Sequence, residues 1–284
     1  MTREEYAALL VPNVKHDCTY YEDLYPERNL EAGAIVTRYA PSPTGFIHIG
    51  ALYSAFIEKT MARQTNGVFF LRIEDTDQKR SIDDGVNKII EDLAKFDVTF
   101  DEGVTKEGDK GNYGPYTQSE RKDIYQAYAK KMIIEDKAYP CFCSEEENEE
   151  IRKMQEKNKE RIGYHGKWAK CRNLSMDEVI SRVQNGEKYI IRLKSNGNFN
   201  KRFTFKDCIK GKVELPENDM DIPIIKSDGL PTYHFAHAVD DHLMHTTHVI
   251  RGDEWFASIP IHTQLFVVLG FKVPKYAHIS PLMI

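Results

Sequence analysis

Apolar and polar positions alternate with different periods along the chain, and each period predicts an element. Residues 34–40 are apolar and β-branched, as in a buried strand, and residues 49–63 follow with the pattern of a helix. Residues 68–73 form a second short apolar run. Apolar residues in 82–96 recur at helical spacing and line one face. This order of strand, helix, strand, helix predicts the first half of a doubly wound, Rossmann-like parallel α/β sheet.

Beyond residue 106 the pattern becomes a mixture of helices and short strands. Two helix starts carry capping boxes, Ser144 with Glu147 and Ser175 with Glu178. The further elements that we expect are helices near 119–137 and 258–269, strands at 139–143, 189–194, 202–207, 212–215, 222–226, 233–238 and 247–250, and a turn at 240–241. We therefore predict one nucleotide-binding domain split by an inserted α+β domain. Its parts are an N-terminal extension (1–33), a first half (34–106), the insertion (107–225) and a second half (226–284).

Composition limits the class of protein. The 284 residues include 14 Phe, 15 Tyr and 2 Trp, enough apolar area to exclude disorder throughout. No apolar run approaches the length of a membrane span, and the start lacks a secretion signal, so we expect a cytoplasmic protein that does not bind a membrane. The net charge of −5 argues weakly against a nucleic-acid partner.

The distribution of charge weakens that objection. Residues 107–225 hold 23 Lys and Arg against 21 Asp and Glu, whereas the rest of the chain holds 16 against 23. Within the insertion, residues 187–212 carry eight bases and two acids with interleaved aromatic residues. Such a segment suits a polyanion with stacking sites, and it equally suits a solvated strand face with ordinary core aromatics.

The strongest local pattern is the loop between the first strand and the first helix, which reads RYAPSPTGFIHIG over residues 38–50. Open α/β sheets bind ligands at such a junction, and a helix N-terminus attracts phosphate. His48 stands there and can donate a hydrogen bond to a phosphate whose charge grows during transfer. A plain strand–helix turn with a core histidine is the structural alternative.

This loop resembles the R-F-A-P-S-P-T-G-x-x-H-x-G signature of the glutamyl-tRNA synthetases, which are class I aminoacyl-tRNA synthetases. Further matching strings are LRIEDTD at 71–77, DGLPTYHFA at 228–236, VDDH at 239–242 and IRGDEW at 250–255. Ser42 and Thr44 separate the chain from the glutaminyl enzymes, which carry Glu and Asn there. The resemblance covers residues 34–284 and implies the class I catalytic fold.

The resemblance also implies a reaction and a site. Glutamate attacks the α-phosphate of Mg²⁺-ATP to give glutamyl-adenylate, and tRNA-Glu then accepts the glutamyl group. The residue types fit, because guanidiniums pair with carboxylates and an acid can pair with an ammonium group. The glutamate positions are Arg38, Ala40, Ser42, Glu74, Tyr233, His237 and Arg251. The ATP positions are Thr44, His48, Gly50, Ala51, Glu254, Trp255 and Leu282, of which Thr44, His48 and Gly50 are the expected catalytic group.

Several roles stay open at this point. The residues do not decide which arginine reads which carboxylate, and a surface acid cluster or a structural Arg251–Glu254 pair would also fit these strings. The insertion should grip the tRNA acceptor stem, and the expected tRNA positions are Asp77, Arg80, Lys194, Lys201 and Arg202. tRNA-Gln is a further candidate substrate, and we expect a monomer.

Cysteines and histidines suggest metal sites. Cys141, Cys143 and Cys171, with His165 or the neighbouring Tyr164 as a fourth ligand, could hold a structural Zn²⁺, although Asn173 stands where some relatives have a final histidine. Free structural thiols are the alternative. Five histidines lie within residues 234–248, and strand alternation would place His234 and His237 on opposite faces, which disfavours a metal there.

The chain ends without the Lys-rich KMSKS loop of the family, so we expect a catalytic-core fragment whose aminoacylation is poor. Three rivals share part of the pattern: a glutamyl-queuosine tRNA-Asp synthetase, a catalytically inactive tRNA- or nucleotide-binding module, and another H-x-G-H nucleotidyltransferase. The two-arginine, one-glutamate pocket and the insertion disfavour the last of these.

Overall fold

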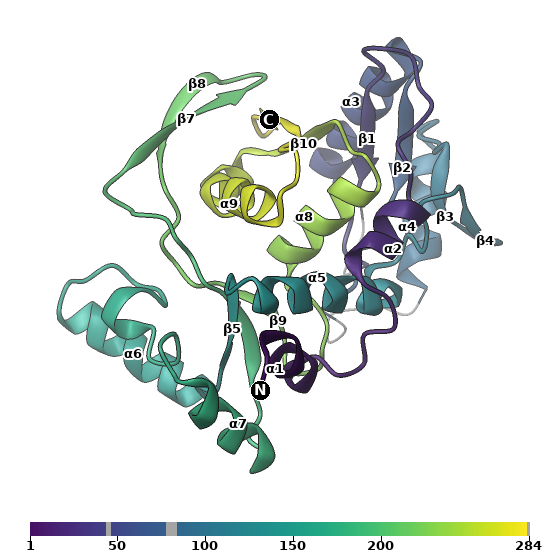
Figure 1. Ribbon diagram of the computed structural model, residues 1–284. Coiled ribbons are helices and arrows are strands. Elements are labelled where there is room, and N and C mark those ends of the chain that lie inside the picture. The colour runs from purple at the N-terminus through teal and green to yellow at the C-terminus, as the bar shows by residue number, and fades with distance from the viewer. Residues whose placement is uncertain (44–46, 78–83, 283–284) are drawn as a thin grey trace.

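A parallel sheet with helices on both faces forms the centre of the protein (Figure 1). The computed structural model describes residues 1–43, 47–77 and 84–282. One group of strands, in spatial order, is β1 (Val36–Tyr39), β2 (Val68–Leu71), β3 (Glu102–Thr105) and β4 (Gly108–Lys110), of which only β4 is antiparallel to its neighbour. A second parallel pair is β10 (His248–Gly252) with β11 (Lys275–Ile279).

The two groups of strands meet between β1 and β10. The Thr247 amide donates to the Val36 carbonyl at 3.0 Å, and the Val36 amide donates to the Thr247 hydroxyl at 2.8 Å. The spatial order is therefore β3, β2, β1, β10, β11. From the junction of β1 and β10, later strands are added outward on both sides, β2 and β3 beyond β1 and β11 beyond β10. Open α/β sheets bind ligands at such a switch point, beyond the carboxyl ends of the strands.

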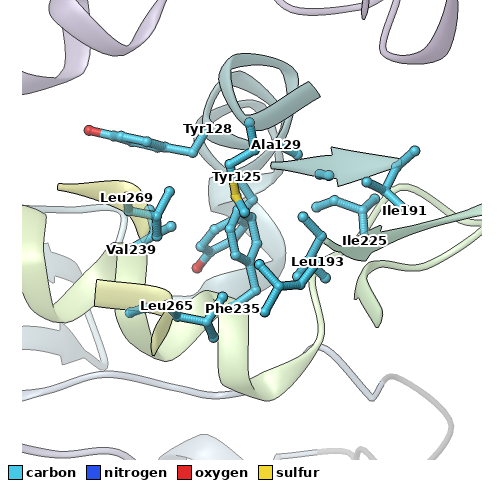
Figure 2. Close-up of a cluster of buried hydrophobic side chains, with 14 of the residues drawn as sticks. Tyr125, Tyr128, Ala129, Ile191, Leu193, Ile225, Phe235, Val239, Leu265 and Leu269 are labelled. Carbon is cyan, nitrogen blue, oxygen red and sulfur yellow. The ribbon is translucent and has the colours of Figure 1, made fainter. Parts of the chain in front are cut away.

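Helices cover both faces of this sheet because its side chains alternate. Tyr39 and Leu71 pack with α3 (Ile49–Gln64) on one face. Val36 and Phe70 belong to the larger core on the other face, with α5 (Lys122–Ile134) and α8 (Tyr233–Leu243). Figure 2 shows the centre of that core, where Tyr125 of α5 lies close to Phe235 of α8. The predicted doubly wound fold is confirmed.

The region predicted as an insertion contains its own sheet. Strands β5 (Ala138–Cys141), β6 (Ile190–Leu193) and β9 (Pro223–Ile225) form it in antiparallel order, and the long hairpin is made of β7 (Arg202–Asp207) and β8 (Gly211–Pro216). The hairpin reaches the central sheet, where Asp207 is in register with Tyr276 of β11. Helices α6 (Glu145–Lys157), η3 (Gly166–Trp168) and α7 (Met176–Gln184) complete the region.

Most predicted helices occur close to their expected limits. The remaining ones are α4 (Gly85–Ala94), η2 (Gln118–Arg121), η4 (Asp253–Ser258) and α9 (Ile259–Leu269). Both predicted capping boxes are present, at the starts of α6 and α7. Residues 82 and 83, at the start of one predicted helix, lie outside the described residues. Among the described helices, none combines the length and the apolar character that crossing a membrane requires.

One predicted strand is wrong. Residues 233–238, together with the expected turn at 240–241, form the helix α8. Its buried Phe235, Val239 and Leu243 recur at helical spacing and face α5 and α9. The expectation that His234 and His237 face apart fails with it, since both rings lie against His262, at centroid distances of 4.9 and 4.4 Å.

The N-terminal extension is a packed part of the fold. It forms α1 (Arg3–Leu10) and α2 (Cys18–Leu24), and both contact α5. Tyr6 and Leu10 are buried in the same core as α5. Thr2 and Glu5 form a capping box that defines the start of α1. This segment contains apolar residues at helical spacing, but its many polar residues make the helical pattern hard to detect in the sequence.

Candidate active site

A cleft of about 770 Å³ lies at the carboxyl ends of β1, β2, β10 and β11, against the start of α3. It is placed where the switch point predicts a ligand. The structure brings these sequence-predicted residues together in its lining: Arg38, Ala40, Ser42, His48, Gly50, Ala51, Glu74, Asp77, Tyr233, Arg251, Glu254, Trp255 and Leu282. Thr44 and Arg80 lie outside the described residues. The lining joins the predicted amino-acid and ATP positions in one space.

At one end of the cleft, α3 begins directly after His48. This residue is the N-cap, and its Nδ1 accepts from the Ala51 amide at 3.3 Å. The imidazole also lies over Gly50, where an added Cβ would come 3.1 Å from Nδ1. Glycine therefore lets the ring stay close to the helix. A helix N-terminus with an exposed imidazole beside it offers N–H groups and a positive potential to phosphate.

Under the other end lies a buried network of charges. Asp241 of α8 accepts from Arg72 at 2.7 Å and from Arg38 at 3.1 Å. Arg72 also donates to Glu74 at 3.1 Å, and Glu58 of α3 lies 3.8 Å from Arg38. The two guanidiniums hold the pKa of Asp241 well below its usual range, against the effect of burial. The charge of Arg38 is thus largely balanced by carboxylates of the protein itself.

Glu74 and Glu58 respond differently from Asp241. Burial raises the pKa of Glu74, opposed by Arg72 and Arg38, and raises the pKa of Glu58 well above its usual range, opposed by Arg38. Glu74 lines the cleft and keeps a small exposed fraction of 9%. An ammonium group of a ligand placed beside Glu74 would stabilise its charged form.

Arg251 of β10 is the cation in the cleft whose partners are all neutral. Its Nε donates to His278 at 2.9 Å, one Nη to His262 at 3.1 Å, and the other Nη to the Trp255 carbonyl at 3.2 Å. No carboxylate of the described residues pairs with it, so the alternative of a structural Arg251–Glu254 pair is wrong. A guanidinium has five N–H donors, so two remain for a ligand. Its charge is therefore available for an anion in the cleft.

His237 was expected in the pocket and lies behind it. It is fully buried in α8, with Nε2 2.9 Å from the Tyr276 hydroxyl and Nδ1 2.9 Å from Asp241. Burial lowers its pKa to about 4. Tyr233, whose ring stacks on that of His237, separates it from the cleft and also contacts Trp255. His237 supports the pocket wall from behind.

Sequence reasoning missed three residues of the site: Arg72, Asp241 and Glu58. Arg72 belongs to the LRIEDTD string and Asp241 to the VDDH string, but the strings alone suggest no role for either residue. Two signals in the sequence could have found them: Arg72 directly follows an apolar run, and Asp241 lies in a segment rich in apolar residues. Both positions indicate a buried charge, and a buried charge requires a partner. Glu58 left no comparable signal, since it lies in an ordinary helical pattern.

The predicted tRNA residues fall on two surfaces. Asp77 lines the cleft, whereas Lys194, Lys201 and Arg202 lie in the region around β6 and the β7–β8 hairpin. Lys194 pairs with Asp136 at 2.9 Å, and Arg192 is buried against the Tyr164 ring. Five further bases of residues 187–212 have no ion pair among the described residues: Lys188, Lys201, Arg202, Lys206 and Lys212. The aromatic Phe205 belongs to a core cluster.

The three cysteines of the predicted zinc site do meet. Their sulfurs lie within 4.8 Å of one another, and those of Cys143 and Cys171 are 3.7 Å apart. Tetrahedral Zn²⁺ with bonds of about 2.3 Å would hold two sulfurs about 3.8 Å apart. The Tyr164 hydroxyl lies 3.4 and 3.3 Å from Cys141 and Cys143. The structure does not bring in His165, whose Nε2 lies 3.0 Å from the Arg161 carbonyl.

The fold and the cleft together define a doubly wound α/β protein with a cleft at its switch point. Residues 34–283 match the family model of class I tRNA synthetases (E and Q), catalytic domain. The chain belongs to this family.

Named relatives agree with this membership. The chain is 54% identical over its full length to a glutamate–tRNA ligase of Clostridium beijerinckii and 51% identical to one of Acetivibrio thermocellus. It spans about half the length of these curated relatives, 51% and 52%. A solved glutamate tRNA ligase of Elizabethkingia meningosepticum, in complex with its amino acid, superposes with a TM-score of 0.80 at 37% identity. That match covers 87% of this chain and 49% of the other.

Proposed function

We propose that this chain carries the catalytic site of a glutamate–tRNA ligase. In this reaction L-glutamate attacks the α-phosphate of ATP to form glutamyl-adenylate and pyrophosphate. The terminal adenosine hydroxyl of tRNA-Glu then takes the glutamyl group and releases AMP. The names of the relatives support the substrates, and the cleft supports the chemistry, because it joins an anion-binding helix start to a carboxylate-binding arginine.

The observation that carries the proposal is the state of Arg251. A buried guanidinium on neutral acceptors, with two N–H groups left, is matched by a substrate carboxylate, which can accept both in a bidentate pair. Arg38, already on Asp241, adds positive potential to the same end. Glu74 lines the cleft and supplies the negative charge for the substrate ammonium. The three together fit an amino acid with an acidic side chain.

The other end of the cleft is proposed for ATP, which brings its own Mg²⁺. The amides at the start of α3 and the His48 imidazole would bind phosphate oxygens as charge develops on them. Gly50 and Ala51 keep this approach open, and the half-exposed Trp255 offers a ring face to the adenine. Glu254 and Leu282 line the same end, and Thr44 stays a proposed member of this group.

tRNA is proposed to bind along the β7–β8 hairpin and the cleft mouth. Lys201 and Arg202 stand at the start of β7 with their charge unshared among the described residues, which suits phosphate contacts. Lys194, Asp77 and Arg80 stay in the proposed set. The four predicted parts, 1–33, 34–106, 107–225 and 226–284, likewise stay our division of the chain, with the insertion gripping the acceptor stem.

Zinc is proposed at Cys141, Cys143 and Cys171. The sulfur spacing fits the metal, and Tyr164 offers the nearest oxygen for a fourth position. The site would fix the end of β5 to the loop before α7, far from the cleft.

We further propose that the protein acts in the cytoplasm as a monomer, where tRNA and ATP are present. A role toward tRNA-Gln stays open beside tRNA-Glu.

The direct test is amino-acid selectivity. Isothermal titration of the chain with L-glutamate and with L-glutamine should show glutamate binding at one site, at least about tenfold more tightly, because glutamine lacks the charge that Arg251 pairs with. Equal affinity for the two amino acids, or no binding of glutamate, would contradict the proposal.

A further inference from the structure

A line of hydrogen bonds leads from the β7–β8 hairpin to the cleft. Asp207, the last residue of β7, lies 2.7 Å from Nδ1 of His278 through its Oδ2. Nε2 of the same imidazole accepts from Nε of Arg251 at 2.9 Å. Asp207 and His278 are buried, at 1% and 0% exposure, and neither lines the cleft. Three elements are thus joined in series, β7, β11 and β10.

The protons along this line are fixed by what each atom can do. Arg251 only donates, so Nε2 of His278 must be unprotonated, and the ring proton sits on Nδ1 and points to Asp207. Burial lowers the pKa of His278, which favours this neutral ring. Asp207 therefore selects the tautomer that gives Arg251 its acceptor. The same logic orients the imidazole of a catalytic triad.

Asp207 is itself held by the turn that follows β7. Its Oδ1 accepts from the amides of Ile209 and Lys210, both at 2.9 Å. The carboxylate is therefore oriented by the hairpin. Its Oδ2 faces Nδ1 of His278 and also accepts from the backbone amide of His278 at 3.3 Å, which lies 3.5 Å from Oδ1. The hairpin joins the central sheet through one register pair, Asp207 with Tyr276. The hairpin and the guanidinium are thereby connected through His278.

We propose that Asp207 and His278 are positioning residues that orient Arg251 for a substrate carboxylate, so that the β7–β8 hairpin sets the affinity of the cleft for the amino acid. This inference rests on the proposed function, in which Arg251 binds glutamate. It assigns a role in amino-acid binding to a residue of the inserted region, about one strand away from the cleft.

Asp207→Asn tests this series of hydrogen bonds from Asp207 through His278 to Arg251, called the relay below, with little change of side-chain shape. The two turn amides keep the side-chain oxygen of the new residue on their side, so its amide group faces Nδ1 and drives the proton to Nε2. Nε2–H then opposes Nε–H of Arg251. We expect affinity for L-glutamate, measured by calorimetry, to fall about tenfold, and affinity for ATP to stay unchanged. Glu214→Gln is the matched carboxyl-to-amide control, on the same hairpin, where Glu214 pairs with Thr204.

Two variants of His278 separate positioning from structural support. The side chain of His278→Gln reaches the Nε2 position and can still accept from Arg251. That of His278→Asn reaches only the Nδ1 position and can still donate to Asp207. We expect His278→Gln to bind L-glutamate within about threefold of the parent and His278→Asn to lose about tenfold. A merely structural role predicts instead that both losses follow the loss of stability.

Nitrogen-15 NMR of the histidines supplies a readout independent of binding. The parent and Glu214→Gln should show His278 protonated at Nδ1, and Asp207→Asn should show it protonated at Nε2, with a shifted Arg251 Nε–H signal. An unchanged tautomer in Asp207→Asn, or glutamate affinity within twofold of the parent, would overturn the relay. If the parent binds no glutamate, the proposed function fails, and the tautomer and the Arg251 signal alone then decide the relay.

Discussion

Arg251 and Arg121 are both buried arginines, and the structure gives them opposite roles. Arg251 has neutral partners and faces the cleft. Arg121 donates to Asp240 at 2.7 Å and to two backbone carbonyls, and it lies outside the cleft. Replacing each by Gln should therefore separate ligand binding from stability.

The expected magnitudes follow from the partners. Arg251→Gln removes charge-assisted bonds to the substrate, worth about 1.5–3 kcal/mol, so L-glutamate affinity should fall roughly 10- to 150-fold. The variant leaves no carboxylate behind, and its unfolding free energy should fall by only about 1–2 kcal/mol. Arg121→Gln removes the 2.7 Å ion pair of Asp240, a core residue with 0% exposure that keeps only the longer pair with Arg72 at 3.8 Å, and this loss should cost about 3–5 kcal/mol.

Urea unfolding and calorimetry of the two variants test this pair of predictions. Arg121→Gln should unfold at clearly lower urea, and its folded fraction should bind L-glutamate as the parent does. Arg251→Gln should keep most of the stability and lose most of the affinity. These two roles are wrong if Arg251→Gln binds glutamate within twofold of the parent, or if Arg121→Gln is the more stable of the two.

Three further predictions concern other parts of the chain. Purified protein should contain about one Zn²⁺ by atomic absorption, and Cys143→Ser should lose it while Cys208→Ser keeps it; an equal content in both would exclude the site. Because the pKa of His237 is lowered from 6.5 to about 4, the unfolded state binds a proton that the folded state does not between these values. Stability should therefore fall as pH drops from 6.5 to 4, by on the order of 3 kcal/mol, and His237→Gln should flatten that dependence in urea titrations; an identical slope in both proteins would refute it. Lys201→Gln with Arg202→Gln should weaken tRNA-Glu binding in filter assays and lower its salt dependence by about two charges, whereas Lys15→Gln, an exposed base on the N-terminal segment, should not; equal effects would place tRNA elsewhere.

Local pattern predicted the elements whose contacts are local. The start of α3 after His48 and the capping boxes of α6 and α7 depend on residues within a few positions, and the structure shows these helix starts as expected. The strand predicted at 233–238 failed because tyrosine and phenylalanine favour strands and Asp240-Asp241 is typical of a turn. Those acids are buried in a helix because Arg121 and Arg72 reach them from distant parts of the chain.

The site could be predicted as a set of residues and could not be predicted as an arrangement. Arg38 and Arg251 look equivalent in the sequence. The structure distinguishes them, since Arg38 lies on Asp241, 203 positions away, while Arg251 lies on His278 and His262. Tyr164 rather than His165 lies against the sulfurs of Cys141 and Cys143, because Nε2 of His165 is taken by a backbone carbonyl. Such long-range partners are fixed by packing, and no local spacing encodes them.

The proposed function requires that one cleft bind glutamate and ATP side by side. A sulfamoyl analogue of glutamyl-adenylate spans both ends and can be titrated into the chain beside its glutaminyl counterpart. We expect the glutamyl analogue to bind at one site, more tightly than L-glutamate or ATP alone and at least about tenfold more tightly than the glutaminyl analogue. This binding should be lost in Arg251→Gln. Equal binding of the two analogues, or binding that Arg251→Gln leaves intact, would contradict it.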